Sequence, residues 1–320
     1  MGRCSPSRRA SPALVLWACM ILSSCAPADN VEALFYELDH PDNEVRFEAE
    51  QRLAQLVRDG SYDPFVRALE SDNLLIRANS IVYLGQMPQP DARRALRSLL
   101  AVDRRMMLPY NPIQMKPSSE PVDSRVLVAT MFQRTEPDPE AIATLLEDAS
   151  VEQEPEAVIG TCLAIGALED ARGVPFLAAA TGHSEVDVVR AAIEALGHVG
   201  GPEALAALVG KLRHPSRLVR IDVMSALDLW PRSESGDAIR SLGAGDESPD
   251  IRRAAIEMLV HSGGPDIVPY LIERLDDPDD SVRLAAVAGL ERVTGKALKP
   301  DAAAWKAWWS QNKSSFNATL

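Results

Sequence analysis

The sequence predicts an all-α protein, an α-solenoid of about eight helix-turn-helix repeats that ends in a C-terminal capping helix. Two observations carry this prediction. A leucine with the same neighbours returns about every 31 residues, and amphipathic helical patterns fill the space between successive copies. Self-similarity at a period of ~20–50 residues is the signature of a repeat architecture. Since no stretch shows the period-2 alternation of a strand, we expect helices only.

The second helix of each predicted repeat has an anchor position near its end, occupied by Leu53, Leu84, Phe132, Leu168, Leu196, Leu227, Leu259 and Leu290. A small side chain stands four residues before the anchor in most copies. Positions i and i+4 lie on one helix face, so the anchor and the small residue are expected to face the core together. The residue seven before the anchor is usually an arginine, as at Arg46, Arg77, Arg125, Arg220, Arg252 and Arg283.

The first helix of each repeat is clearest in two passages that begin with a Gly-Pro pair. These passages start at Gly201 and Gly264 and match over an offset of 63 residues without a gap, about twice the single period. Their apolar residues fall at i, i+3, i+4 and i+7, which is one face of an α-helix. A turn with proline follows each passage and leads into the arginine-bearing helix. The repeating unit is therefore helix, turn, helix.

The start of the second helix carries a capping residue in several copies. These residues stand four positions before the arginine and can accept a backbone N–H of the first turn: Asp42, Asn73, Ser216, Ser248 and Asp279. The arginines themselves need partners, because the helix dipole disfavours a cation in the first turn. Acids stand in the turns just upstream, at Asp39, Asp72, Asp246 and Asp276.

The run Val-Arg-x-x-Ala-x-x-x-Leu at 282–290, with its turn and first-helix leucines, resembles the HEAT repeat in its short, phycobilin-lyase-like variety. The resemblance covers residues 29–294. It implies that the arginines form a structural ladder of Asp–Arg pairs between adjacent units, at Arg46, Arg77, Arg220, Arg252 and Arg283. An anion-binding stripe is the alternative interpretation. The resemblance does not imply one activity, because such arrays serve many unrelated partners.

Residues 1–24 are predicted to be an export signal that takes no part in the fold. Three arginines precede an apolar run, 13–22, which is too short to span a bilayer. The run ends in Leu-Ser-Ser before Cys25, which resembles a bacterial lipobox and makes Cys25 the expected lipidation site. Residues 25–28 would then be a short tether. An ordinary signal peptide with a chance cysteine is the alternative.

Lipidation at Cys25 predicts a protein anchored through acyl chains on the outer side of the cytoplasmic membrane. Ala26 after the cysteine favours the periplasmic side of the outer membrane in a Gram-negative cell. Loss of the three signal arginines takes the net charge from −13 to about −16. This acidity argues against nucleic acid as a partner and is compatible with a cationic protein partner.

The regular spacing fails once, between Leu84 and Phe132, which are 48 residues apart. The surplus is an insert loop at 102–121, whose prolines exclude a regular helix. It is basic and rich in Met within an acidic chain, and insertions in repeat arrays often map to the binding face. We therefore expect partner-binding residues there, namely Arg104, Arg105, Met106, Met107, Tyr110, Met115 and Lys116. A loop folded back over the solenoid edge is the alternative, and the concave helix face is then the binding candidate.

The C-terminal segment, 295–320, contains Trp305, Trp308 and Trp309 at i, i+3 and i+4, one heavy apolar face of a last helix. Terminal units of a solenoid need a cap, so this segment is predicted to be one. An aromatic contact site for protein or carbohydrate is the alternative.

Cys162 is expected to be a packed small side chain and not a reactive thiol, because no cation in the local sequence would lower its pKa.

The sequence contains no recognisable catalytic motif. It has no Gly-rich phosphate loop, His-Glu-x-x-His, Cys-x-x-Cys or Gly-x-Ser-x-Gly, so neither a metal nor a cofactor is predicted. The expected function is a non-enzymatic, lipid-anchored scaffold that binds an unknown protein. Two alternatives remain, a lyase-type repeat enzyme acting on a chromophore protein and a carbohydrate-binding module that uses the Trp face.

Overall fold

The computed structural model describes residues 30–101, 104–111, 114, 116–135, 137–149, 154–262, 264–314 and 316. Within these ranges the chain forms two compact units. The described residues up to 96, with 107–122, make the first unit, and those of 97–106 and 123–316 make the second. The predicted signal, Cys25 and the tether lie outside the described residues. No helix in the described part of the chain is long and apolar enough to cross a membrane.

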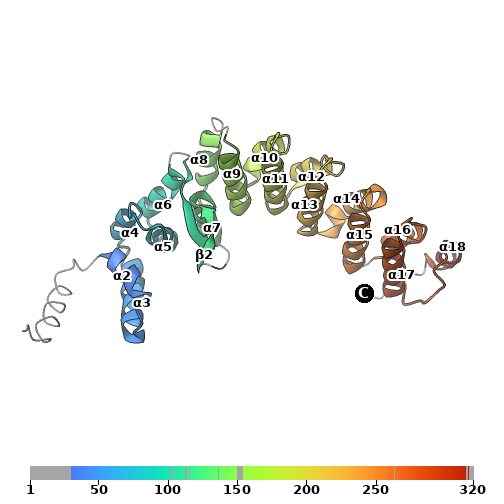
Figure 1. Cartoon of the computed structure of the whole chain (residues 1–320), viewed down its shortest axis with the longest axis horizontal. Coiled ribbons are helices and arrows are strands. Elements are labelled where there is room, and N and C mark those ends of the chain that lie inside the picture. Colours follow the sequence, from blue (N-terminus) through green and yellow to red (C-terminus); the bar gives the residue numbers. More distant parts are fainter. Residues whose placement is uncertain are drawn as a thin grey trace, which may run out of the picture. The chain divides into compact units, whose positions relative to one another are not determined.

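The first unit contains five helices and a hairpin, which are α2 (Val31–Glu37), α3 (Asn43–Arg58), α4 (Asp63–Ala68), α5 (Leu74–Gly85), α6 (Pro90–Arg97), β1 (Met107–Asn111) and β2 (Lys116–Asp123). Helix α2 packs on α3 and α4, and α4 packs on α5 (Figure 1). Rings of Phe35, Phe65 and Tyr83 meet in this core with centroids 5.5–6.2 Å apart. Aromatic pairs at this separation add to the stability that their buried area provides.

The insert is a β-hairpin, which corrects the expectation of a loop in an entirely helical chain. In β1, Leu108 and Tyr110 are buried at 0% and 4% exposure, whereas Met107 is 54% exposed. This alternation is that of a strand with one face on a core, and the core here is α5, against which β1 packs. Pro109 in the middle of β1 obscured the pattern, because proline is confined to edge strands and bulges. A two-stranded sheet consists only of edge strands.

The second unit contains the remaining elements, which are η1 (Ser98–Leu100), α7 (Ser124–Arg134), α8 (Ala141–Ala149), α9 (Pro155–Leu168), η3 (Ala171–Gly173), α10 (Val174–Ala180), α11 (Val186–Val199), α12 (Pro202–Val209), α13 (Arg217–Asp228), α14 (Arg232–Gly245), α15 (Pro249–Ser262), η4 (Pro265–Ile267), α16 (Val268–Arg274), α17 (Asp280–Thr294) and α18 (Ala302–Asn312). The second helices of successive repeats, α7, α9, α11, α13, α15 and α17, contact one another in sequence. Each second helix from α9 to α17 also packs on the first helix of its own repeat, which are α8, α10, α12, α14 and α16 in that order. Figure 1 shows first and second helices of this unit on opposite sides of the row. The predicted all-α solenoid is confirmed.

Seven of the eight predicted anchors are buried, and Leu168 is the exception. Leu168 is half-buried at the end of α9, whereas Ile165 is fully buried and lies 31 residues before Leu196. The register of this repeat is therefore three residues earlier than the sequence pattern suggested. A Cβ on Gly166 would lie 3.0 Å from the Cβ of Ala195, which is closer than two Cβ atoms normally come. Glycine at this position therefore allows α9 to pack closely on α11.

The same close approach recurs one repeat later, where a Cβ on Gly197 would lie 2.9 Å from the Cβ of Ala226. Gly166 and Gly197 therefore occupy equivalent positions on α9 and α11, which supports the corrected register. In the corrected register, Cys162 is equivalent to Ile193, which is fully buried, and not to Arg190, which is partly exposed.

Three predicted caps accept a backbone N–H two residues further on, each at 2.9 Å: Asp42, Asn73 and Asp279. Ser216 occupies the N-cap position of α13, but its side chain makes no capping hydrogen bond. The hydroxyl of Ser248 accepts a hydrogen bond from Nε of Arg217 at 3.1 Å.

Helix α18 covers the end of the second unit. Trp305 is fully buried and its helix packs on α16. Trp308 and Trp309 are half-buried and contact Phe316, with ring centroids 6.0 and 5.3 Å from it. This position and burial are those of a cap that shields the last repeat from water.

Candidate functional site

Two of the five arginines assigned to the ladder bind the acid of the following repeat. Nε and Nη2 of Arg220 donate to the two carboxylate oxygens of Asp246 at 2.7 and 3.1 Å. Arg252 makes the same two-pronged contact with Asp277 at 2.9 and 2.7 Å. All four side chains are buried. Because the fork geometry matches the two oxygens, these pairs link adjacent repeats in a fixed orientation.

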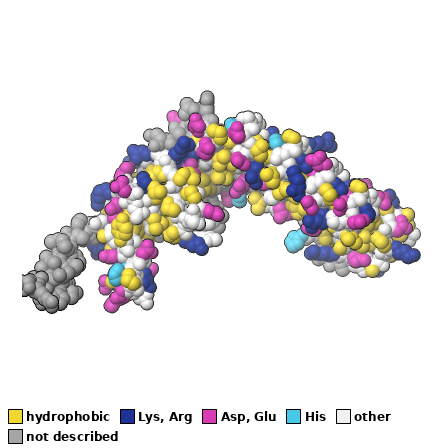
Figure 2. Space-filling view, in the orientation of Figure 1, with side chains coloured by type: hydrophobic (Ala, Val, Ile, Leu, Met, Phe, Trp, Pro, Cys, Tyr) yellow, Lys and Arg dark blue, Asp and Glu magenta, His cyan; other side chains and the backbone are white. Residues whose placement is uncertain are grey.

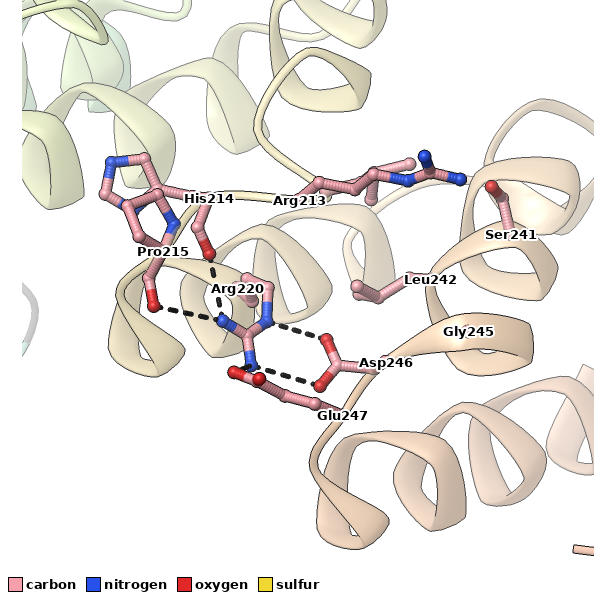
Figure 3. A pocket seen from close by; sticks show the side chains of 10 residues that line it. Arg213, His214, Pro215, Arg220, Ser241, Leu242, Gly245, Asp246 and Glu247 are labelled. Atoms are coloured by element: carbon pink, nitrogen blue, oxygen red, sulfur yellow. Dashed lines mark hydrogen bonds and ion pairs between the residues drawn. The ribbon is translucent and has the colours of Figure 1, made fainter.

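All five N–H groups of the Arg220 guanidinium have acceptors, as Figure 3 shows. Nη1 donates to the backbone carbonyls of His214 at 2.9 Å and Pro215 at 3.3 Å, and Nη2 also reaches Glu247 at 3.0 Å. The hydrogen bond to Asp246 raises the pKa of Arg220 above its usual value. A surface pocket of about 430 Å³ lies beside this cluster, but the guanidinium has no donor left for an anion there.

The other three ladder arginines make no such contact with the following repeat among the described residues, and two of them bond within their own repeats. Arg46 bonds to the carbonyl of His40 and to the side chain of Asn43. Arg283 donates to the carbonyl of Asp277 at 2.6 Å and pairs with Asp280. Nε of Arg77 is buried without a hydrogen-bond partner among the described residues. The link between repeats therefore involves Arg220 and Arg252 in the part of the chain that the structure describes.

A further buried arginine, Arg125, was outside the predicted ladder. Its side chain is 1% exposed, and it pairs with Asp123 two residues earlier at 2.8 Å. It also donates to the Thr161 hydroxyl at 2.8 Å and to the carbonyl of Ala157 at 2.9 Å, both in the next repeat. A Cβ on Gly160 would lie 2.5 Å from Nη2 of Arg125. Gly160 and Thr161 thus provide the space and the hydroxyl that accommodate this arginine.

A groove of about 520 Å³ crosses the second helices α9, α11 and α13. Its apolar lining is Ile159, Leu163, Ala191, Ala226 and Leu229, and its polar lining is Asp187, Arg190, Glu194, His198, Asp222 and Ser225. Leu229 is 58% exposed at the end of α13. An open groove with apolar and charged side chains together suits recognition of a protein surface.

Arg190 forms two ion pairs within this groove, and the pair with Asp222 links two repeats. Nε and Nη2 of Arg190 donate to Asp222 at 2.6 and 3.4 Å. Asp187 lies 3.8 Å from Nη1 of the same arginine. The hydrogen bond to Asp222 raises the pKa of Arg190, so the arginine stays charged. Figure 2 shows acidic, basic and hydrophobic side chains interspersed over the visible face of the second unit.

A family model for HEAT repeats matches residues 31–106, 139–228 and 210–291. The chain belongs to the HEAT-repeat family. No curated protein sequence matches it. Similar solved structures include YibA of Escherichia coli (16% identity, 90% of this chain and 100% of that chain, TM-score 0.44). Human deoxyhypusine hydroxylase with glycerol also matches (23%, 85% and 98%, 0.34). So does the CpcE–CpcF complex of phycocyanin lyase from a Nostoc species (18%, 78% and 94%, 0.38).

The insert residues that were predicted to contact a partner differ in their exposure. Met107, Arg104, Arg105 and Lys116 are exposed, and Met106 is half-buried. Tyr110 is in the core beneath the hairpin, so its side chain is not available to a partner in this conformation. Met115 lies outside the described residues. The structure therefore leaves only the outward side of the hairpin as a contact candidate.

The groove residues were not predicted from the sequence, because the repeat pattern is defined by the buried positions of the HEAT repeat and the groove lies on exposed ones. A usable signal was present on α11, where Asp187, Arg190, Glu194 and His198 follow at helical spacing. Cys162 is not a functional thiol candidate, since burial raises its pKa to about 12. Among the described residues, no group of His, Cys, Asp or Glu side chains is arranged to hold a metal ion.

Proposed function

We propose that this HEAT-repeat protein is a non-enzymatic scaffold that binds another protein while anchored to a membrane through acyl chains on Cys25. The observation that supports binding most directly is the open groove across α9, α11 and α13. It combines exposed apolar area with charges, as protein interfaces do. The buried arginines hold neighbouring repeats in register, which gives such a surface a defined shape.

The anchor rests on the sequence around Cys25 and places the protein on the outer side of the cytoplasmic membrane. Several acyl chains together anchor a protein stably in a membrane, whereas a single chain gives only marginal binding. The tether 25–28 reaches at most roughly 15 Å at ~3.5 Å per residue. The first described helix, α2, would therefore begin close to the membrane surface.

In-cell photo-crosslinking of the full-length protein tests this function. A crosslinking amino acid is placed singly at exposed positions of the second helices and of the hairpin, and products are identified by mass spectrometry. We expect a reproducible protein partner that is retained in the membrane fraction. If every position yields only monomer or crosslinks to lipid, the binding function is wrong.

A further inference from the structure

The groove over α9, α11 and α13 is built from three parallel stripes of side chains. On α11 the stripe is Asp187, Arg190, Glu194 and His198, which follow at three- and four-residue spacing. Ile159 and Leu163 stand four residues apart on α9, as do Asp222 and Ala226 on α13. Residues at these spacings share a helix face. Since α11 contacts both α9 and α13, the stripes form one continuous surface.

The length of this surface matches about three turns of an α-helix. From Asp187 to His198, α11 advances roughly 16 Å at ~1.5 Å per residue. The apolar side chains of α9 and of the end of α13 flank the charged stripe of α11. A helix laid into such a groove presents apolar residues at i, i+4 and i+7 and charged residues beside them.

The charge of the groove determines which helix fits. Its three carboxylates, on Asp187, Glu194 and Asp222, face the single cation of Arg190, with His198 at the end. Asp222 is occupied by Arg190 at 2.6 Å. The Glu194 carboxylate is exposed, and, after the hydrogen bond to Asp222, its charge contributes to the raised pKa of Arg190. The groove therefore has an excess of negative charge next to its apolar lining, which favours a cationic ligand and repels an acidic one.

We propose that this groove binds a basic amphipathic helix of the partner protein. Apolar side chains of that helix, such as Leu, pack against Ile159, Leu163 and Leu229, and its Lys or Arg side chains pair with Glu194 and Asp187. The inference rests on the proposed binding function and adds the chemistry of the partner. It is consistent with the acidic net charge of −13, which attracts cationic ligands over a longer range.

Binding of synthetic helices to the full-length protein in non-ionic detergent tests the proposed chemistry. The probe is a fluorescent peptide of about 15 residues with Leu at i, i+4 and i+7 and Lys on both flanks. Two matched peptides replace every Lys by Glu or every Leu by Ser. We expect the basic amphipathic peptide to bind at least about tenfold more tightly than either, and more weakly as salt is raised. Equal affinities for all three peptides would overturn the proposal.

Matched substitutions separate the groove from general attraction to an acidic protein. Glu194→Lys lies in the groove, and Glu203→Lys makes the same charge change at an exposed position of α12. Leu229→Ser is matched by Val209→Ser, since both side chains are exposed, at 58% and 43%. The two groove variants should weaken the peptide by about tenfold and the α12 variants by less than about twofold. Equal losses in both pairs would place the binding elsewhere.

Crosslinking position then separates this inference from the proposed function. The photo-reactive residue replaces Ser225 in the groove or Met107 on the hairpin, both exposed. A partner segment joined to position 225 that is basic, amphipathic and displaced by the peptide supports the inference. Crosslinks from position 107 alone would leave the scaffold function intact and reject the groove. Crosslinks only between copies of this chain would identify self-association and reject a separate partner. Absence of protein crosslinks at position 225 would reject the groove, and absence at every exposed position tested would reject both proposals.

Discussion

At the residue scale, two Asp-x-Arg motifs form ion pairs with very different surroundings. The side chains of Asp123 and Arg125 are 10% and 1% exposed, and Arg125 also donates to a backbone carbonyl of the next repeat. Asp170 and Arg172 form a pair at 2.6 Å, but the arginine is 54% exposed. Water competes for the exposed pair and screens it, whereas the buried pair depends on its protein partners alone. Burial, which the sequence motif does not encode, decides the energetic role.

Arg125→Ala should therefore lower the free energy of unfolding by about 3–5 kcal/mol, because it leaves Asp123 charged and unpaired in the interior. Arg172→Ala is the matched control and should leave the free energy nearly unchanged. Urea unfolding followed by circular dichroism measures both. Equal destabilisation by the two substitutions would show that the burial of Arg125 has no special role.

A pH dependence follows from the pair that Asp277 forms with Arg252. The hydrogen bonds from Arg252 hold the pKa of Asp277 below its usual range in the folded state. The pair therefore stabilises the protein above the unfolded pKa of about 3.9, and this contribution is lost as pH falls through the lower folded pKa. We expect Asp277→Asn to lower stability most near neutral pH and progressively less below about pH 4. A wild-type-to-variant difference that stays constant with pH would contradict this linkage.

At the scale of elements, the hairpin shows how an insert joins the core of its unit. β1 lays Leu108 and Tyr110 on α5, and Met107 points to the other face. This segment, which is basic and rich in Met and Pro, contains strands in place of repeat helices. The strands were not predicted from the sequence, because contact with α5 supplies the apolar burial that a short two-stranded ribbon lacks by itself.

Leu108→Ala should destabilise the first unit by about 2–5 kcal/mol, the cost of removing a fully buried leucine. Met107→Ala changes the neighbouring exposed side chain and should have little effect. Hydrogen exchange of the α5 amides provides the readout, since α5 is the helix beneath the strand. If exchange in α5 is unchanged in Leu108→Ala, the hairpin is a separate appendage whose removal would cost little.

At the scale of the whole molecule, a solenoid distributes its stability over contacts between neighbouring repeats. The buried arginines strengthen some of these contacts, and α18 covers the last one. Such a molecule needs no second core and no disulfide framework, so a single internal cysteine, Cys162, is compatible with an exported chain.

The predicted anchor concerns the whole molecule as well. Cys25→Ala should release the protein from membranes or leave it unprocessed, because no acyl chain can then be attached. Fractionation of cells, with intact-mass measurement of the N-terminus, distinguishes these results. A processed Cys25→Ala protein that still sediments with membranes would show that another element is the anchor.

The sequence by itself determined the all-α repeat, its period and most of its buried anchors. These features depend on residue type at helical spacing and recur in many copies. A single copy that deviates from the pattern therefore does not hide it. It did not determine the register of α9, where a leucine and an isoleucine three residues apart are both plausible anchors. The close approach of Gly166 to Ala195 decided that question.

The tertiary structure alone decided which arginines reach the next repeat and which side chains form the groove. Arg220 and Arg283 stand at the same repeat position, yet only Arg220 finds a buried acid across the interface in the described chain. Likewise Ile159, Glu194 and Leu229 come from three different repeats and become neighbours through helix packing. Contacts between residues distant in sequence depend on how the repeats stack, and no local pattern records that arrangement.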